Sequence, residues 1–187
     1  MLRTRLLSSL LTAATALAVG ACESAPTYPD EPSIEFKNIR AERDTPANGG
    51  TPSNRIFITI GYKDGNGDLG LSAADKDTPP FNSSTSDYRF NYHVKLYWYN
   101  TNYLRFEEYV YPNPALTYNG TFARMLEETA KPQPIRGDLT YEPGKGDGFP
   151  INYPEFRPGN RVKFDIYIYD RALHKSNVIT TEELVLP

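Results

Sequence analysis

The sequence has very little cysteine and histidine. Of its 187 residues, one is Cys and two are His. A disulfide framework needs paired cysteines and a zinc finger needs clusters of Cys and His, so both are excluded. His93 and His174 lie far apart with no ligand spacing between them, which leaves most histidine-based catalysis without its residues.

The sequence also lacks an excess of positive charge and any recognisable catalytic motif. Twenty Lys and Arg face 23 Asp and Glu, for a formal net charge of −3. This near balance shows no nucleic-acid footprint, so no nucleic-acid partner is expected. There is no serine nucleophile elbow, no phosphate-binding glycine loop and no Cys/His pair, and we therefore expect no enzyme.

The N-terminus has the pattern of an export signal. Arg3 and Arg5 precede an uncharged apolar stretch at residues 6–19, which is too short to span a bilayer comfortably. The following residues, Val19-Gly20-Ala21-Cys22, resemble the lipobox of bacterial lipoproteins. The alternative is a plain secretory signal with a leftover cysteine. We expect residues 1–21 to be the signal peptide.

The lipobox resemblance implies that Cys22 is acylated and holds the protein on a membrane. Glu23 rather than Asp follows Cys22, which favours the outer membrane, with the periplasmic and outer sides both open. Residues 22–32 are rich in proline and predict an extended tether, which would lift the domain roughly 30 Å from the membrane.

Residues 33–187 are expected to form one β-domain. Hydrophobic residues make up 39% of the chain and aromatic residues 13%, enough for a core. Alternating apolar and polar residues predict strands, with Pro and Gly between them, over residues 33–43, 55–63, 88–99, 103–111, 161–169 and 177–186. The only helical candidate is residues 122–131. The prediction is an all-β, antiparallel β-sandwich with long loops at 64–87 and 112–158 and at most one short helix.

The end of the chain refines this fold. Residues 157–177 (RPGNRVKFDIYIYDRALHKSN) combine a Pro-Gly corner, a long alternating strand and a Ser-Asn turn. They resemble the last two strands of immunoglobulin and fibronectin-III-like domains. The resemblance implies an immunoglobulin-like sandwich, although the lack of a cysteine pair excludes a true antibody-type domain.

An acidic loop follows the second predicted strand. Residues 64–75 (DGNGDLGLSAAD) alternate short oxygen-bearing side chains with glycine, at a spacing that resembles EF-hand and dockerin calcium loops. Leu69 stands where the sharp turn wants Gly, and the last position is Asp rather than Glu. The alternative is a turn whose side chains cap their own backbone. The predicted calcium ligands are Asp64, Asn66, Asp68, Gly70, Ser72 and Asp75.

Topology adds Asp170 to this set. In an immunoglobulin-like sandwich, the loop that leaves the second strand and the loop that leaves the penultimate strand lie at the same pole. Asp170 directly follows the penultimate strand and is therefore an additional candidate ligand; its alternative role is to cap a turn.

Four tyrosines are predicted to share an outer face. Tyr97 and Tyr99 point away from the core side of their strand, and Tyr167 and Tyr169 do so on a strand expected beside it. An exposed aromatic ladder of this kind suits the binding of sugar rings. The alternative is ordinary cross-strand pairing that stabilises the sheet.

The combined pattern resembles a wider group. A strand followed by residues 64–70 (DGNGDLG), then tyrosine-rich strands, then residues 170–177 (DRALHKSN), is similar to uncharacterised outer-membrane lipoproteins of the Bacteroidota type. The resemblance implies a cell-envelope location and carries no activity. We expect an interaction or structural module, stabilised by calcium if the loop binds it, that engages an envelope protein. Glycan binding through the tyrosine face is the alternative.

Overall fold

A computed structural model describes residues 26–111, 113, 117–145 and 148–187. The predicted signal peptide (1–21), Cys22 and the first part of the tether lie outside the described residues. Within the described part of the chain, no helix is both long and apolar enough to cross a bilayer.

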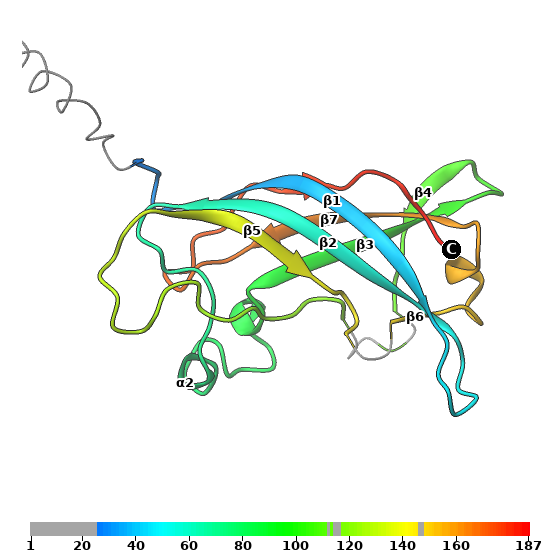
Figure 1. Cartoon of the computed structure of the whole chain (residues 1–187), viewed down its shortest axis with the longest axis horizontal. Helices are drawn as coiled ribbons and strands as arrows, with labels where there is room; N and C mark the ends of the chain where they lie inside the picture. Colours follow the sequence, from blue (N-terminus) through cyan, green and yellow to red (C-terminus); the bar gives the residue numbers. More distant parts are fainter. Residues whose placement is uncertain (1–25, 112, 114–116, 146–147) are drawn as a thin grey trace, which may run out of the picture.

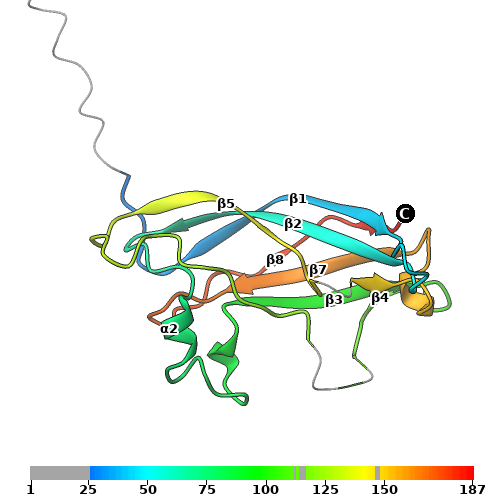
Figure 2. The ribbon, with the colours of Figure 1, turned by 60° about the horizontal axis from the view of Figure 1, so that its bottom comes forward.

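The domain is a sandwich of two antiparallel sheets (Figures 1 and 2). In the first sheet, β2 (Ser53–Asp64) pairs with β1 (Ser33–Asp44), β5 (Ile135–Tyr141) and β6 (Phe149–Pro150). The second sheet has the order β4 (Arg105–Glu108), β3 (Tyr92–Asn100), β7 (Arg161–Ile168) and β8 (Ile179–Thr180), with β9 (Leu184–Val185) also on β7. This strand order is that of an immunoglobulin-like sandwich, which confirms the predicted all-β fold class.

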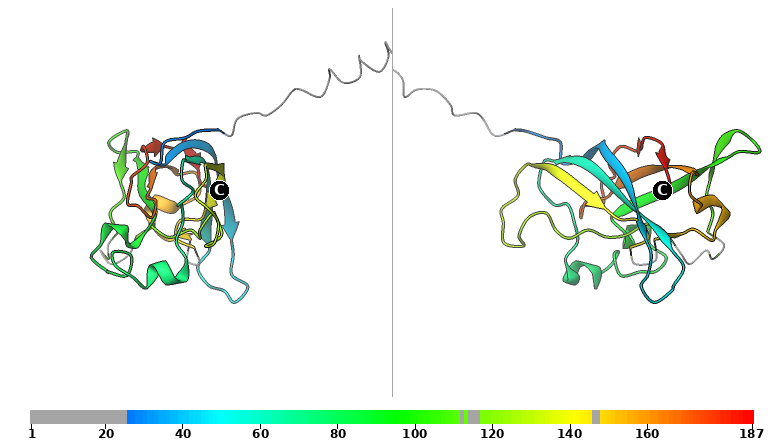
Figure 3. Two further views of the ribbon diagram at one scale, coloured as in Figure 1. Left: turned by 90° about the vertical axis from the view of Figure 1, so that its left-hand side faces the viewer. Right: turned by 45° about the vertical axis from the view of Figure 1, so that its right-hand side comes forward.

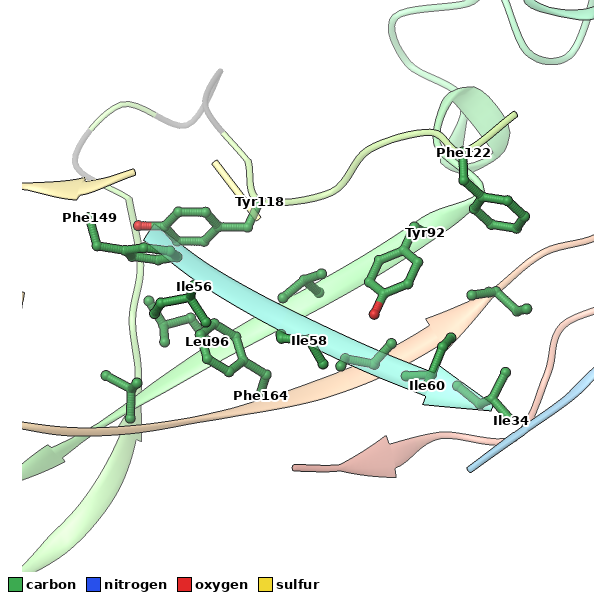
Figure 4. Packing of buried hydrophobic residues seen from close by; sticks show 14 of the residues in the cluster. Ile34, Ile56, Ile58, Ile60, Tyr92, Leu96, Tyr118, Phe122, Phe149 and Phe164 are labelled. Atoms are coloured by element: carbon green, nitrogen blue, oxygen red, sulfur yellow. The ribbon is translucent and has the colours of Figure 1, made fainter. Parts of the chain in front are cut away.

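The core lies between the sheets because each central strand buries every second side chain. Ile56, Ile58 and Ile60 of β2 face the apolar side of β7, where alternate residues from Val162 to Ile168 are fully buried (Figure 4). Burial of each such side chain contributes about 1.5–3 kcal/mol. The apolar alternation in the sequence is therefore the direct cause of the two-layer arrangement, which Figure 3 shows end-on.

A β-bulge explains the irregular alternation of β1. Phe36 pairs with Ile60 and Asn38 with Thr59, so Lys37 is an extra residue in the ladder. The bulge shifts the inward side from even to odd positions, and Ile39 and Ala41 pack against the core after it. A single strand thus spans the segment in spite of its change of phase.

The predicted helix at residues 122–131 is wrong. This segment forms no α-helix because its backbone pairs with the acidic loop instead: Leu71 N donates to Phe122 O, and Met125 N donates to Leu69 O. The described α-helix is α2 (Ala73–Lys76), within that loop, and two 3-10 turns lie at Asp87–Arg89 and Pro154–Phe156.

Residues 112–158, predicted to be a loop, contain the strands β5 and β6. The inward positions of β5 run Ile135, Gly137, Leu139 and Tyr141, and the glycine interrupts the apolar alternation. The expected last strand at 177–186 is divided into β8 and β9.

Strand β2 runs between two ends of the sandwich, roughly 35 Å apart for a strand of this length. We call the end of β2 and β7, where the chain enters and α2 lies, the acidic pole (Figure 1). The opposite end, formed by the start of β2 with β6 and residues 153–156, is the aromatic pole.

Candidate metal and ligand sites

Three aspartates from two loops meet at the acidic pole. Asp64 ends β2, Asp68 lies in the loop that follows it, and Asp170 follows β7 in the other sheet. One carboxylate oxygen from each lies within 4.8 Å of the other two. The structure thus places Asp170 beside this loop, and its role as a ligand stays a prediction. A backbone bridge between Leu69 and Asp170 fixes the two loops together.

The hydrogen bonds leave part of this cluster unsatisfied. Asp64 Oδ1 accepts from the backbone N–H groups of Gly67 and Asp68, and Asp68 Oδ2 accepts from Ala172 N at 3.1 Å. Asp64 Oδ2 and Asp68 Oδ1 are buried and have no hydrogen-bond partner. A buried carboxylate oxygen without a partner is costly, so these two atoms require an explanation.

Asp170 is held by the turn that it begins. Its Oδ1 accepts from His174 N at 2.7 Å, and its Oδ2 lies 2.9 Å from His174 Nδ1. Each oxygen still has lone-pair capacity, because a carboxylate offers about four acceptor positions. Asp170 therefore combines the turn-capping role with a position in the cluster.

Burial dominates the electrostatics of the three carboxyls. It raises the pKa of Asp64 to about 6, and the nearby Asp68 and Asp170 add to the rise. Burial also raises the pKa of Asp68 and of Asp170. The hydrogen bond to Asp170 raises the pKa of His174. Asp64 and Asp170 are 0% and 1% exposed, so water does little to screen their mutual repulsion.

Asp75 does not join the cluster, although the loop spacing predicted it as a ligand. Its carboxylate receives a two-pronged ion pair from Arg124, with Nη2 at 2.6 Å and Nε at 2.8 Å. It also accepts from Ser72 N at 2.7 Å, while Ser72 Oγ accepts from Asp75 N. The two residues form a capping box for α2, and the Arg124 guanidinium holds the pKa of Asp75 well below its usual range.

The other two predicted ligands also bond to protein. Asn66 Oδ1 accepts from Asp68 N at 3.0 Å, in a local turn. The Gly70 carbonyl accepts from Arg171 Nη1 at 3.2 Å. Among the carboxylates of the loop, Asp64 and Asp68 converge with Asp170, whereas Asp75 is not part of this group.

Backbone packing positions the loop. A Cβ on Gly65 would lie 2.4 Å from Tyr28 O, because residues 28–29 cross directly over this glycine. Gly67 has a φ of +75°, and a Cβ there would meet Leu126 and Gln133 O. The chain that enters the domain thus lies against the acidic loop. Residues 28–29, expected to be part of a free spacer, belong to the domain surface.

The four outer tyrosines share a face but do not form one ladder. Tyr97 pairs with Lys163, whereas Tyr167 pairs with His93, which lies four residues before Tyr97 in β3. The Tyr97–Tyr99 pair is therefore roughly 13 Å from the Tyr167 position along the sheet. Lys95 and Asp165 lie between the two pairs.

Two of these tyrosines, Tyr99 and Tyr167, have a neighbouring side chain packed over the ring face. Arg161 lies 3.6 Å from the centre of the Tyr99 ring, and Lys175 lies 3.8 Å from the centre of the Tyr167 ring. His93 stacks on Tyr167 at 4.6 Å. This arrangement supports the alternative of sheet stabilisation rather than a flat platform for sugars.

A cavity at the aromatic pole was missed by the sequence analysis. It has a volume of about 530 Å³. Its described lining is mainly aromatic, with amide, hydroxyl and one ammonium group: Tyr109, Tyr111, Tyr118, Tyr141, Tyr153, Phe156, Asn113, Asn119, Thr117 and Lys145. The sequence signal was weak, a density of tyrosines in and after the predicted strand at 103–111, because the lining residues are spread over nearly 50 positions.

Tyr118 and Phe156 line the cavity, and Phe149 packs against both of them without lining it. Tyr118 stacks on Phe149 with ring centres 4.6 Å apart, and Phe149 meets Phe156 edge to face at 5.3 Å (Figure 4 shows the first pair). Tyr118, Phe149 and Phe156 are nearly or fully buried, whereas Tyr153 at the rim is 41% exposed. The wall is therefore part of the core, and the rim is accessible.

Comparison with known proteins adds no assignment: no protein-family model, no curated protein and no solved structure matches the chain.

Proposed function

We propose that this protein is a lipid-anchored module of the outer membrane that binds an envelope partner and performs no catalysis. The lipobox-like Val19-Gly20-Ala21-Cys22 supports the anchor. The aromatic cavity supports the binding role, and it is the observation that carries the proposal. The wider likeness to Bacteroidota-type lipoproteins agrees with an envelope location.

The size and lining of the cavity favour a ligand or an inserted side chain. A volume of about 530 Å³ falls within the usual range for ligand sites, which are mostly apolar with a few polar groups. Tyrosines bring large contact areas with few rotatable bonds, which makes them common anchors at protein interfaces. A loop of a partner protein with an apolar or aromatic tip fits this chemistry.

The position of the cavity also supports binding. The described chain enters the domain at the acidic pole, beside Gly65. The cavity lies at the other end of β2, because its lining residue Pro150 pairs with Ser53 at the start of that strand. Figure 1 shows these two ends of β2. A domain anchored through Cys22 would thus present the aromatic pole away from its point of attachment.

A glycan is the second candidate occupant. Tyrosine rings stack on sugar rings, and the Asn119 amide and Thr117 hydroxyl at the cavity supply polar groups. Because the tyrosines of the outer face are separated into two pairs, the cavity is a better candidate for glycan binding than that face. No carboxylate is among the described lining residues, so the lining supports binding rather than acid–base chemistry.

Site-specific photo-crosslinking in intact cells tests the proposal. A photoreactive amino acid replaces Tyr153 at the cavity rim, and the matched control replaces Tyr103, an exposed aromatic (66%) of the β3–β4 turn outside the cavity lining. We expect a discrete adduct from position 153 and none from position 103. Protease digestion of the adduct separates a protein partner from a glycan. Equal labelling at both positions, or none at either, contradicts the proposal.

A further inference from the structure

We propose that the acidic pole is a calcium site, formed by the carboxylates of Asp64, Asp68 and Asp170. The inference is independent of the aromatic cavity and of the envelope partner. It rests on the convergence of three carboxylates from two loops and on two buried oxygens that no protein group satisfies.

The geometry suits a calcium ion. Calcium binds oxygen ligands at 2.3–2.6 Å, so two oxygens on opposite sides of one ion are about 4.8 Å apart. The three carboxylates each place an oxygen within this distance of the other two. All the ligand atoms are oxygens of carboxylates, which hard cations prefer. Calcium also takes six to eight ligands, so water and backbone carbonyls would complete the shell.

The unsatisfied oxygens indicate that a cation belongs there. Asp64 is 0% exposed, yet its Oδ2 has no hydrogen bond, although its Oδ1 accepts two. Asp68 shows the same division, with Oδ2 bonded to Ala172 N and Oδ1 unpartnered. The backbone amides thus orient both carboxylates and leave one oxygen of each for another ligand. A divalent cation would satisfy both oxygens and neutralise charge that is otherwise repulsive.

The nearby cations do not fill this role. Arg171 donates to the carbonyls of Leu69 and Gly70, and His174 bonds to Asp170. Arg124, the other arginine near the loop, is paired with Asp75. Among the described residues, no lysine or arginine forms an ion pair with Asp64 or Asp68 within 4.0 Å.

The ion would fasten the two sheets together. Asp64 ends β2 of the first sheet, Asp68 lies in the loop after it, and Asp170 follows β7 of the second sheet. The two loops already share the Arg171 N to Asp68 O bond, at 3.3 Å. Since residues 28–29 cross over Gly65, the ion would stiffen the same end of the domain that receives the tether.

Thermal unfolding of the purified protein tests the site, with calcium alone, magnesium alone or a chelator present. A hundredfold excess of calcium over its Kd should raise the Tm by about 5–10 °C above the value in chelator. Asp68→Asn keeps the shape of a half-buried side chain but removes one of the three negative charges, so it should sharply reduce this rise. Asp75→Asn is the matched control: it should lower the starting Tm but keep the full calcium-dependent rise.

Three results would overturn the proposal. One is a wild-type Tm that calcium leaves unchanged up to millimolar concentration, with no binding heat in a titration of calcium alone. Another is a calcium-dependent rise that survives Asp68→Asn but disappears in Asp75→Asn, which would restore the EF-hand-like ligand set. The third is an equal rise with magnesium at the same concentration, which would reject calcium as the ion.

Discussion

The two poles of the sandwich lie at the two ends of β2 and differ in chemistry: one is formed by carboxylates and the other by aromatic rings. At the acidic pole, β2 ends in a buried carboxylate that the loops orient through backbone amides. At the aromatic pole, β2 begins beside Phe149, and stacked rings enclose a cavity. The same strands form the framework at both poles, and the residues of the connecting loops determine which functional groups each pole presents. The contrast shows that a sandwich of this type has two independent candidate sites.

A second contrast lies within the acidic loop itself. Asp64 and Asp75 are eleven residues apart, yet their surroundings shift their pKa values in opposite directions. Burial raises the pKa of Asp64 to about 6, whereas Arg124 lowers the pKa of Asp75. One carboxylate therefore lacks a positive partner and the other has one. This difference separates a candidate ligand from a structural cap.

The largest effect is expected at the aromatic pole. Phe149 is fully buried and contacts Tyr118, Phe156 and Phe164. Phe149→Ala should lower the free energy of unfolding by about 3–5 kcal/mol, through lost burial and the void that remains. Urea unfolding measures this change. Tyr103→Ala, in an exposed turn, serves as the control and should stay within about 0.5 kcal/mol. A loss for Phe149→Ala as small as that expected for Tyr103→Ala would refute the place of Phe149 in the core.

The next effect concerns the contact between the entering chain and the acidic loop. Gly65→Ala places a Cβ against the Tyr28 and Pro29 carbonyls, so the backbone must move, at about 1–3 kcal/mol. Gly50→Ala, where the nearest atoms are 3.3 Å from the new Cβ, is the milder control. Equal stability of the two variants in urea would show that residues 28–29 do not rest on Gly65.

A smaller effect distinguishes the cap from the ligands by its pH dependence. Asp75→Asn weakens the Arg124 ion pair and should cost about 1–2 kcal/mol at pH 7. Since the folded pKa of Asp75 lies below the usual value of 3.8, its stabilisation is present above that pH and is lost as the pH falls through the folded pKa. The gap between wild type and variant should therefore shrink below about pH 4.

Urea titrations at pH 7, 4 and 2.5 follow this gap. The exposed Asp77→Asn is the matched control on the same turn and should behave as wild type throughout. A gap that stays constant down to pH 2.5 would contradict the role assigned to the Arg124–Asp75 pair.

The smallest effect is expected on the outer tyrosine face. Lys175→Ala removes the ammonium over the Tyr167 ring and should cost about 0.5–1 kcal/mol. Crosslinking from position 153 should be unchanged, because Lys175 is not part of the cavity. A loss of crosslinking in this variant would move the binding role back to the outer face.

The sequence predicted the parts of the fold that depend on alternation. Alternate apolar residues of β2, β3 and β7 are buried, and this alternation can be recognised directly in the amino-acid sequence. The meeting of Asp170 with Asp64 and Asp68 also followed, because strand order fixes which loops share a pole. β5 was not predicted because Gly137 interrupts the apolar alternation on its inward side.

The ligand set could not be read from spacing alone. A short acidic side chain at regular intervals suits both ion binding and helix capping, and Arg124, 49 residues from Asp75, decides between them. The aromatic cavity could not be predicted from the sequence for a related reason. Its rings come from four separate segments, which only the folded chain brings together.

A crystal structure grown with calcium tests the contrast between Asp64 and Asp75 most directly. The account predicts one ion at the acidic pole with six to eight oxygens at 2.3–2.6 Å, including Asp64, Asp68 and Asp170, while Asp75 keeps its ion pair with Arg124. An ion coordinated by Asp75, Asn66 and Asp68 away from Asp170, or no ion at this pole in millimolar calcium, would contradict it.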